Sequence, residues 1–210
     1  MEVKEINEKI LKHLKETDYS IISKDISTNI SGRIPHHMMQ VLYSICSLYD
    51  IKTYMEIGVH NGASMSYVIQ EPIPKKCFGV DLFENGKLYA FDKLTKQRTE
   101  QNIQKNNKSN SNVTLIQGDS THDSTINSVG NLIKEPIDLL FLDGDHSYAG
   151  VKHDFENYSK YVKSGGFILL DDYHKSKWPG IKQFVDNDID TTKFTRVGWY
   201  NENELLFIKK

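Results

Sequence analysis

The stretch TYMEIGVHNGAS, from Thr53 to Ser64, decides the fold of this chain. An apolar, strand-like run ends at Glu56 and opens into two glycines, Gly58 and Gly62, after which SMSYVIQ is compatible with a helix. Glycines in such a turn let a ligand approach the backbone, and the first amides of the following helix can donate hydrogen bonds to that ligand. The pattern predicts a strand, a ligand-binding turn and a helix, although a tight turn without a ligand has the same outline.

Two further apolar runs also end in acids. FGVDLF carries Asp81, which lies 23 residues beyond Gly58, and VTLIQGDS carries Asp119. An acid at about this distance from the glycine turn is what a nucleoside-binding α/β domain uses to hold ribose hydroxyls. The spacing therefore indicates three strands whose polar ends line one edge of a sheet.

The next two runs end in three more acids. FLDGDHSY contains Asp143, and SGGFILLDDY ends in Asp171 and Asp172. Carboxylates at the ends of adjacent parallel strands converge, and they repel one another unless something positive joins them. Oxygen ligands of this kind suit Mg²⁺, so these three residues are the predicted metal ligands.

The glycine turn resembles that of the class I S-adenosylmethionine-dependent methyltransferases. Its pattern E-x-G-x-x-x-G-x-S comprises Glu56, Gly58, Gly62 and Ser64, which we predict as cofactor-binding residues. His60 occupies the place of the middle glycine of the commonest version, as it does in the catechol O-methyltransferase-like subgroup. The absence of G-x-G-x-x-G weakens a dehydrogenase interpretation.

The same resemblance implies a role for each polar strand end. Gly58 and the nearby backbone would contact the methionine part of S-adenosylmethionine, and Glu56 would help to shape that pocket. Asp81 would bind the ribose, while Asp119 with Ser120 would face the adenine.

The acids also resemble the metal site of catechol-type and macrocin-type O-methyltransferases. An Asn commonly follows the second acid in the catechol enzymes, whereas this chain has Asp172, as the macrocin-like sugar methyltransferases do. His146 stands where the catechol-type enzymes carry a lysine and could accept a proton near neutral pH. Asp143 is the rival base, so the two are the predicted catalytic residues.

Other interpretations of these motifs remain open. Single Asp residues often cap helices or end strands without binding a metal. Asp143 and Asp145 also form the D-x-D pattern of metal-dependent nucleotide-sugar glycosyltransferases. A non-catalytic S-adenosylmethionine-binding assembly or regulatory protein would keep the glycine turn and ignore the metal.

Composition restricts the class of protein. The 210 residues, 38% hydrophobic and 26% charged, suffice for one α/β core, and a net charge of −2 without a basic stripe argues against a nucleic-acid partner. No stretch approaches the length of a membrane span. Cys46 and Cys77 form no disulfide framework, which favours a reducing, cytoplasmic location.

The first 35 residues precede the expected catalytic core of residues 36–210. A helix is predicted from an apolar stripe that packs on the domain or contacts a second copy in a homodimer: Val3, Ile6, Ile10 and Leu14. The polar stretch from Thr17 to Arg33 could fold over the site as a lid. Pro35 is well placed to begin a second helix.

We therefore expect a single domain with a Rossmann-like α/β fold and helices on both faces. Its seven-stranded, mostly parallel sheet would have strands near residues 52, 77, 113, 137, 166, 194 and 204, with a closing hairpin around Asn201 to Asn203 and one antiparallel strand at the end. The expected activity is Mg²⁺-dependent methyl transfer from S-adenosylmethionine to a hydroxyl of a small molecule, a sugar or glycoside being preferred over a catechol.

Overall fold

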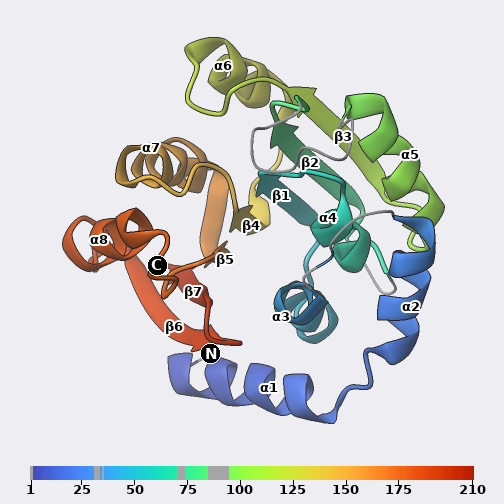
Figure 1. Ribbon diagram of the computed structural model, residues 1–210. Coiled ribbons are helices and arrows are strands. Elements are labelled where there is room, and N and C mark those ends of the chain that lie inside the picture. The colour runs from blue at the N-terminus through green and yellow to red at the C-terminus, as the bar shows by residue number, and fades with distance from the viewer. Residues whose placement is uncertain (1, 31–33, 35, 71–73, 85–94) are drawn as a thin grey trace.

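The computed structural model describes residues 2–30, 34, 36–70, 74–84 and 95–210, and the described strands form a seven-stranded sheet of order β3-β2-β1-β4-β5-β7-β6 (Figure 1). The strands are β1 Thr53–Ile57, β2 Lys76–Asp81, β3 Asn112–Gln117, β4 Ile137–Leu142, β5 Val162–Leu170, β6 Phe194–Tyr200 and β7 Glu204–Lys209. Each lies where the sequence predicts a strand. The expected Rossmann-like methyltransferase architecture is confirmed.

Helices cover both faces of the sheet (Figure 1). They are α1 Val3–Glu16, α2 Ser20–Asn29, α3 His36–Leu48, α4 Ala63–Val68, α5 Lys96–Asn106, α6 Asp123–Leu132, α7 Tyr148–Tyr158 and α8 Pro179–Asn187, with a 3₁₀ turn at Ser159–Tyr161. One apolar core includes residues from α1 to α5, and the other includes residues from α6, α7 and α8.

The central strands are apolar because both of their faces are covered. Every residue of β1 and β4 is buried, as expected for parallel strands between two helical layers. Along β1 the side chains alternate: Tyr54 belongs to one core, while Met55 and Ile57 belong to the other. The acidic side chain of Glu56 lies on the same face of the sheet as that of Tyr54.

Hydrogen bonds continue between the strands past their carboxyl ends. The amide of Gly58 donates to the carbonyl of Val80, that of Asp143 to Ile57, and that of Asp171 to Leu142, at 2.9, 2.9 and 3.1 Å. These bonds fix the residues that follow β1, β4 and β5 beside one another. The acids therefore share one edge of the sheet, as the sequence predicts.

The chain closes with the predicted hairpin. Strands β6 and β7 are antiparallel, and residues 201–203 form the turn between them. The antiparallel strand, β7, is last in the chain but not at the edge of the sheet, because it is inserted between β5 and β6. Its first residue, Glu204, thereby lies at the same edge as the acids.

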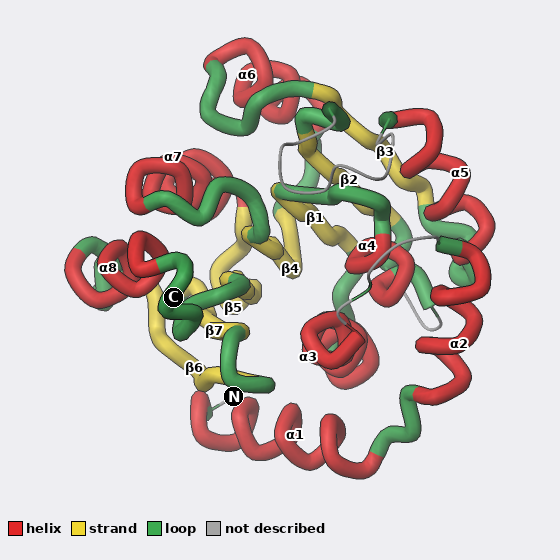
Figure 2. The backbone as a smooth tube through the Cα atoms, in the orientation of Figure 1, coloured by secondary structure: helices red, strands yellow, loops and turns green. Residues whose placement is uncertain are grey.

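The N-terminal segment packs on the domain. Ile6 and Ile10 of α1 are fully buried, and α1 lies along α3 and β6 (Figures 1 and 2). The stretch expected to be a polar lid contains a helix, α2, which packs against α4 and α5. Pro35 and residues 31–33 lie outside the described residues. None of the helices in the described ranges has the length and apolar character needed to cross a membrane.

Candidate active site

The glycine turn touches the end of β4. Gly58 has a φ of 92°, and a Cβ on it would lie 2.0 Å from the carbonyl oxygen of Asp143. Only glycine combines this backbone conformation with so close an approach. Gly62, with a φ of 84°, precedes the first turn of α4. The two segments singled out in the sequence are thus in direct backbone contact.

Glu56 is fully buried beneath this turn. Its carboxylate accepts hydrogen bonds from the Tyr54 hydroxyl at 2.7 Å and the Ser64 hydroxyl at 2.5 Å. Burial raises the pKa of Glu56 to about 8, although both hydrogen bonds oppose the shift. Glu56 and Ser64 therefore tie β1 to α4 from inside, beneath the predicted cofactor turn.

Asp81 joins the glycine turn to the loop after β2. Its carboxylate accepts from the backbone amide of His60 at 2.8 Å and from that of Phe83 at 2.7 Å. His60 itself has a φ of 49°, a left-handed conformation that aims its amide at Asp81. Each carboxylate oxygen has a second lone pair, so these bonds leave acceptors for ribose hydroxyls.

Asp119 and Ser120 are held in different ways. Asp119 accepts from the amide and the hydroxyl of Thr121 at 2.9 and 2.7 Å, and these bonds lower its pKa. The carbonyl of Ser120 accepts from the Tyr158 hydroxyl at 2.8 Å, and the Ser120 side chain opposes the rise that burial causes in the pKa of Asp154. Sequence reasoning missed Asp154 and Tyr158, whose four-residue spacing on α7 was the available signal.

The predicted metal ligands are only partly gathered. Potential ligand atoms of Asp143, His146 and Asp171 lie within 4.8 Å of one another, and Asp171 Oδ1 is buried without a hydrogen-bond partner. Burial and the neighbouring Asp143 raise the pKa of Asp171 well above its usual range. A divalent cation would relieve both the repulsion and the unsatisfied oxygen, so this donor set fits one.

Asp172 lies on the other side of His146. It has a φ of 59°, sits 3.3 Å from His146 Nδ1 and forms an ion pair with Lys175. Burial would raise the pKa of Asp172, but the neighbouring His146 and Lys175 lower it. The group of ligand atoms within 4.8 Å of one another thus includes His146, and Asp172 remains a predicted ligand next to it.

His146 lies between Asp143 and Asp172; these two residues and Asp171 are called the acid cluster below. Its Nε2 lies 3.1 Å from Asp143 Oδ1, and its ring packs edge-on against Trp178 at 5.1 Å. Burial lowers the pKa of His146, but Asp143 and Asp172 outweigh this and raise it to about 9. In this arrangement the neighbouring carboxylates favour the protonated form of His146, and only the neutral form can bind a metal or accept a proton, which favours Asp143 as the base.

The D-x-D pattern does not form a paired acidic site. Both carboxylate oxygens of Asp145 bind Ser147, one accepting from its amide at 2.9 Å and the other from its hydroxyl at 2.8 Å. Ser147 in turn caps α7. Asp145 thus acts locally at a helix start, whereas Asp143 belongs to the acid cluster.

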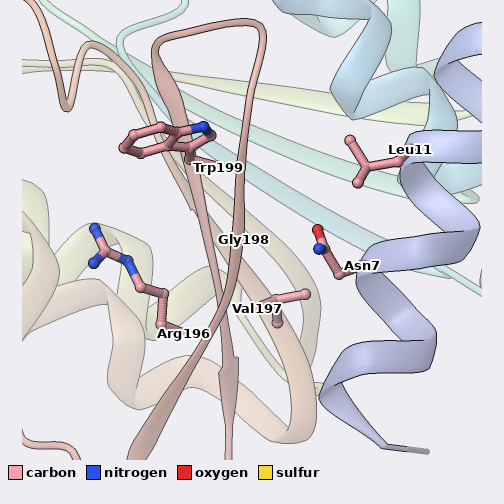
Figure 3. A pocket seen from close by; sticks show the side chains of 6 residues that line it. All are labelled: Asn7, Leu11, Arg196, Val197, Gly198 and Trp199. Atoms are coloured by element: carbon pink, nitrogen blue, oxygen red, sulfur yellow. The ribbon is translucent and has the colours of Figure 1, made fainter.

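A groove of about 490 Å³ lies between α1 and β6, outside the predicted site. Figure 3 shows Asn7 and Leu11 projecting from α1 toward the strand, with Arg196 and Trp199 on the strand's other side. Trp199 packs against His174, whose ring contacts Tyr173 next to Asp172. Ring contacts therefore connect Trp199, which lines the groove, to the segment that carries Asp172.

Comparison with known proteins gives one family match. The model of the methyltransferase domain family matches residues 55–173, which include the glycine turn and the three predicted metal ligands. The uncharacterized protein R132 of Acanthamoeba polyphaga mimivirus is 32% identical over 196 residues, covering 86% of this chain and 83% of that protein.

Solved structures of low sequence identity share the fold. An O-methyltransferase from Bacillus cereus in complex with SAH superposes with a TM-score of 0.67 at 15% identity, covering 99% of this chain and 98% of that one. CalS11, a TDP-rhamnose 3'-O-methyltransferase of calicheamicin biosynthesis, superposes with a TM-score of 0.61 at 16% identity, covering 98% and 93%.

Proposed function

This chain belongs to the methyltransferase domain family, and on that premise we propose that it is an S-adenosylmethionine-dependent O-methyltransferase assisted by a divalent cation. The observation that carries the proposal is the contact between Gly58 and Asp143. It places the predicted cofactor turn in backbone contact with Asp143, one of the predicted metal ligands. Methyl transfer requires such proximity, because the acceptor oxygen must be aligned with the methyl group.

Each part of the chain has a place in this proposal. S-adenosylmethionine supplies an electrophilic methyl group, so the protein mainly has to orient the reactants and exclude water. The backbone at Gly58 approaches the methionine part, Asp81 receives the ribose hydroxyls, and the Asp119–Ser120 segment faces the adenine. Glu56 and Ser64 act beneath the turn by fixing its shape.

The acid cluster would hold the cation and the acceptor. Asp143 and Asp171 would bind the ion, with Asp172 or the neutral form of His146 as the third ligand, and Mg²⁺ would supply Lewis-acid assistance to ionisation of the acceptor hydroxyl. Asp143 is the base that we propose, because His146, 3.1 Å away, would carry a proton whenever it does not bind the ion. The Asp171–Asp172 pair favours a sugar or glycoside acceptor over a catechol, and CalS11 is a sugar methyltransferase of the same fold.

Thermal unfolding with ligands tests this proposal. S-adenosylhomocysteine should raise the unfolding midpoint of the wild type, and Mg²⁺ should raise it further. Asp171→Asn should lose the Mg²⁺ response and keep the S-adenosylhomocysteine response. Asp50→Asn, whose side chain is 67% exposed beside Lys52, is the matched control and should keep both.

The outcomes separate the alternatives. A response to S-adenosylhomocysteine without one to Mg²⁺ would favour a metal-free or non-catalytic binder. No response to S-adenosylhomocysteine would overturn the cofactor assignment. A panel of sugar and catechol acceptors with radiolabelled S-adenosylmethionine then tests the acceptor class, and catechol turnover exceeding sugar turnover would contradict the sugar preference.

A further inference from the structure

Glu204 faces the acid cluster from a strand that the motifs did not include. In the antiparallel pairing of β5 with β7, Leu170 lies opposite Leu205. Continuing this register by one residue places Asp171 opposite Glu204. Directly opposed residues of an antiparallel pair project from the same face with their Cβ atoms about 4.5–5.5 Å apart. Glu204 is therefore the cross-strand neighbour of Asp171.

The carboxylate of Glu204 has no hydrogen-bond partner among the described residues. The residue is 0% exposed, and neither Oε1 nor Oε2 accepts a hydrogen bond. Lys175 is the basic group that acts on it electrostatically, but the Lys175 ammonium is already paired with Asp172. A buried carboxylate without a partner is costly and calls for a functional explanation.

Nearby acidic side chains make burial of the Glu204 carboxylate still less favourable. Asp143 and Asp172 repel the Glu204 carboxylate, and Glu204 in turn repels that of Asp171. Two cations, His146 and Lys175, face these four acids. Like charges that are directly opposed across a sheet destabilise it unless a positive charge joins them.

We propose that Glu204 is a further acidic residue of the divalent-cation site, a positioning residue that supports Asp171 from β7. This inference rests on the cation part of the proposed function and adds a fourth carboxylate behind the three predicted ligands. Residues behind the direct ligands orient them and strengthen the field at the ion, and removing one typically weakens metal binding 10–100-fold.

The test is a titration of the metal-free protein with Mn²⁺, following free Mn²⁺ by electron paramagnetic resonance. Glu204→Gln should raise the Mn²⁺ dissociation constant by about tenfold or more. Its unfolding midpoint without metal should equal or exceed that of the wild type, because the buried carboxyl group that it removes has no hydrogen-bond partner among the described residues. Glu202→Gln makes the same change at an exposed position in the same turn and should leave both quantities unchanged.

A second variant keeps the inference testable if the glutamine is poorly tolerated. Glu204→Asp retains the charge and should bind Mn²⁺ within about threefold of the wild type, against the tenfold loss expected when the charge is removed. Unchanged affinity in Glu204→Gln would overturn the inference. So would a weaker affinity accompanied by a lower metal-free midpoint, because that would show a structural role.

The cation proposal and this inference fail in distinguishable ways. If the wild type does not retain Mn²⁺, the cation part of the proposed function is wrong. If the wild type retains Mn²⁺, Asp171→Asn loses it and Glu204→Gln does not change it, only the role of Glu204 is wrong.

Discussion

At the scale of single residues, Gly58 couples the cofactor turn to the acid cluster. Gly58→Ala should destabilise the protein because the new methyl group would meet the Asp143 carbonyl. Gly165 is the matched control: its φ is also positive, at 77°, but nothing lies within 4 Å of a Cβ there. Both variants place an alanine in a left-handed backbone conformation, which lowers the unfolding free energy by about 1–2 kcal/mol.

Only Gly58→Ala should add an overpacking cost, of about 1–3 kcal/mol. Urea denaturation measures the difference. Equal losses of unfolding free energy in the two variants would show that the turn can move away from Asp143 at no cost. Gly58→Ala should also weaken S-adenosylhomocysteine binding, whereas Gly165→Ala should not.

Glu56 should make stability depend on pH. Its pKa rises from 4.5 to about 8 on folding, so the folded state holds the proton more tightly than the unfolded chain. The stabilisation from this group is complete below pH 4.5 and is lost as the pH rises through 8. Glu56→Gln removes the dependence, so the stability of this variant relative to the wild type should increase from pH 5 to pH 8.5.

Urea denaturation at a series of pH values checks this prediction. Ser64→Ala is a useful companion, because it removes one of the two hydrogen bonds to the carboxylate and should move the wild-type dependence to higher pH. A constant difference between Glu56→Gln and the wild type across this range would contradict the assigned pKa.

The sequence predicts the positions of candidate site residues well where they end strands. Asp81, Asp119, Asp143 and Asp171 lie along one edge of the sheet because parallel strands place their carboxyl ends there. The sequence gives no sign of Glu204 or Lys175 beside these acids, because their positions depend on where β7 inserts and how the loop after Asp172 turns. Asp172 remains a predicted ligand, and its left-handed backbone places it in an ion pair with Lys175.

At the scale of elements, α1 is a structural part of the domain rather than an appendage. Ile10 is fully buried, whereas its neighbour Leu11 is 47% exposed. Ile10→Ala should therefore lower the unfolding free energy by about 2–4 kcal/mol, and Leu11→Ala should change it little. Equal, small effects on stability would show that α1 does not pack as described.

The two variants also test the homodimer expectation. Leu11 lies at the groove between α1 and β6, so a dimer formed through this face would be weakened by Leu11→Ala and detected as a lower mass in size-exclusion chromatography with light scattering. If the wild type is monomeric, the apolar stripe of α1 serves to pack this helix on its own domain.

Helix α2 shows why element prediction from one sequence is incomplete. Residues 20–29 are largely polar, which led to the expectation of a lid. Ile22, Ile26 and Ile30 nevertheless recur every fourth residue, and the last two are buried. The helix is secured by the hydrogen bond between the Ser23 and Tyr67 hydroxyls, a contact with α4 that no local pattern could reveal.

At the scale of the whole molecule, two apolar cores share one sheet. Because β1, β4 and β5 contribute side chains to both cores, neither can be lost without exposing the other. We therefore expect a single unfolding transition. Tryptophan fluorescence reports on Trp178 and Trp199 in the C-terminal part, whereas far-ultraviolet circular dichroism reports on all helices.

The midpoints from the two probes should coincide during urea denaturation, and S-adenosylhomocysteine should move both by the same amount. A fluorescence transition that precedes the loss of helix would show that the C-terminal hairpin unfolds on its own. Asn7→Ala, which removes the bond to the Tyr200 hydroxyl, should lower both midpoints together.

The contact between α1 and β6 has a consequence for biosynthesis. Asn7 and Tyr200 are 193 residues apart in the chain, yet their side chains are hydrogen-bonded in the folded protein. On the ribosome, α1 emerges early and cannot meet β6 until nearly two hundred further residues have been translated. Throughout that interval α1 can pack on α3 but not on β6, so the part of its surface that β6 covers becomes buried only at the end of translation.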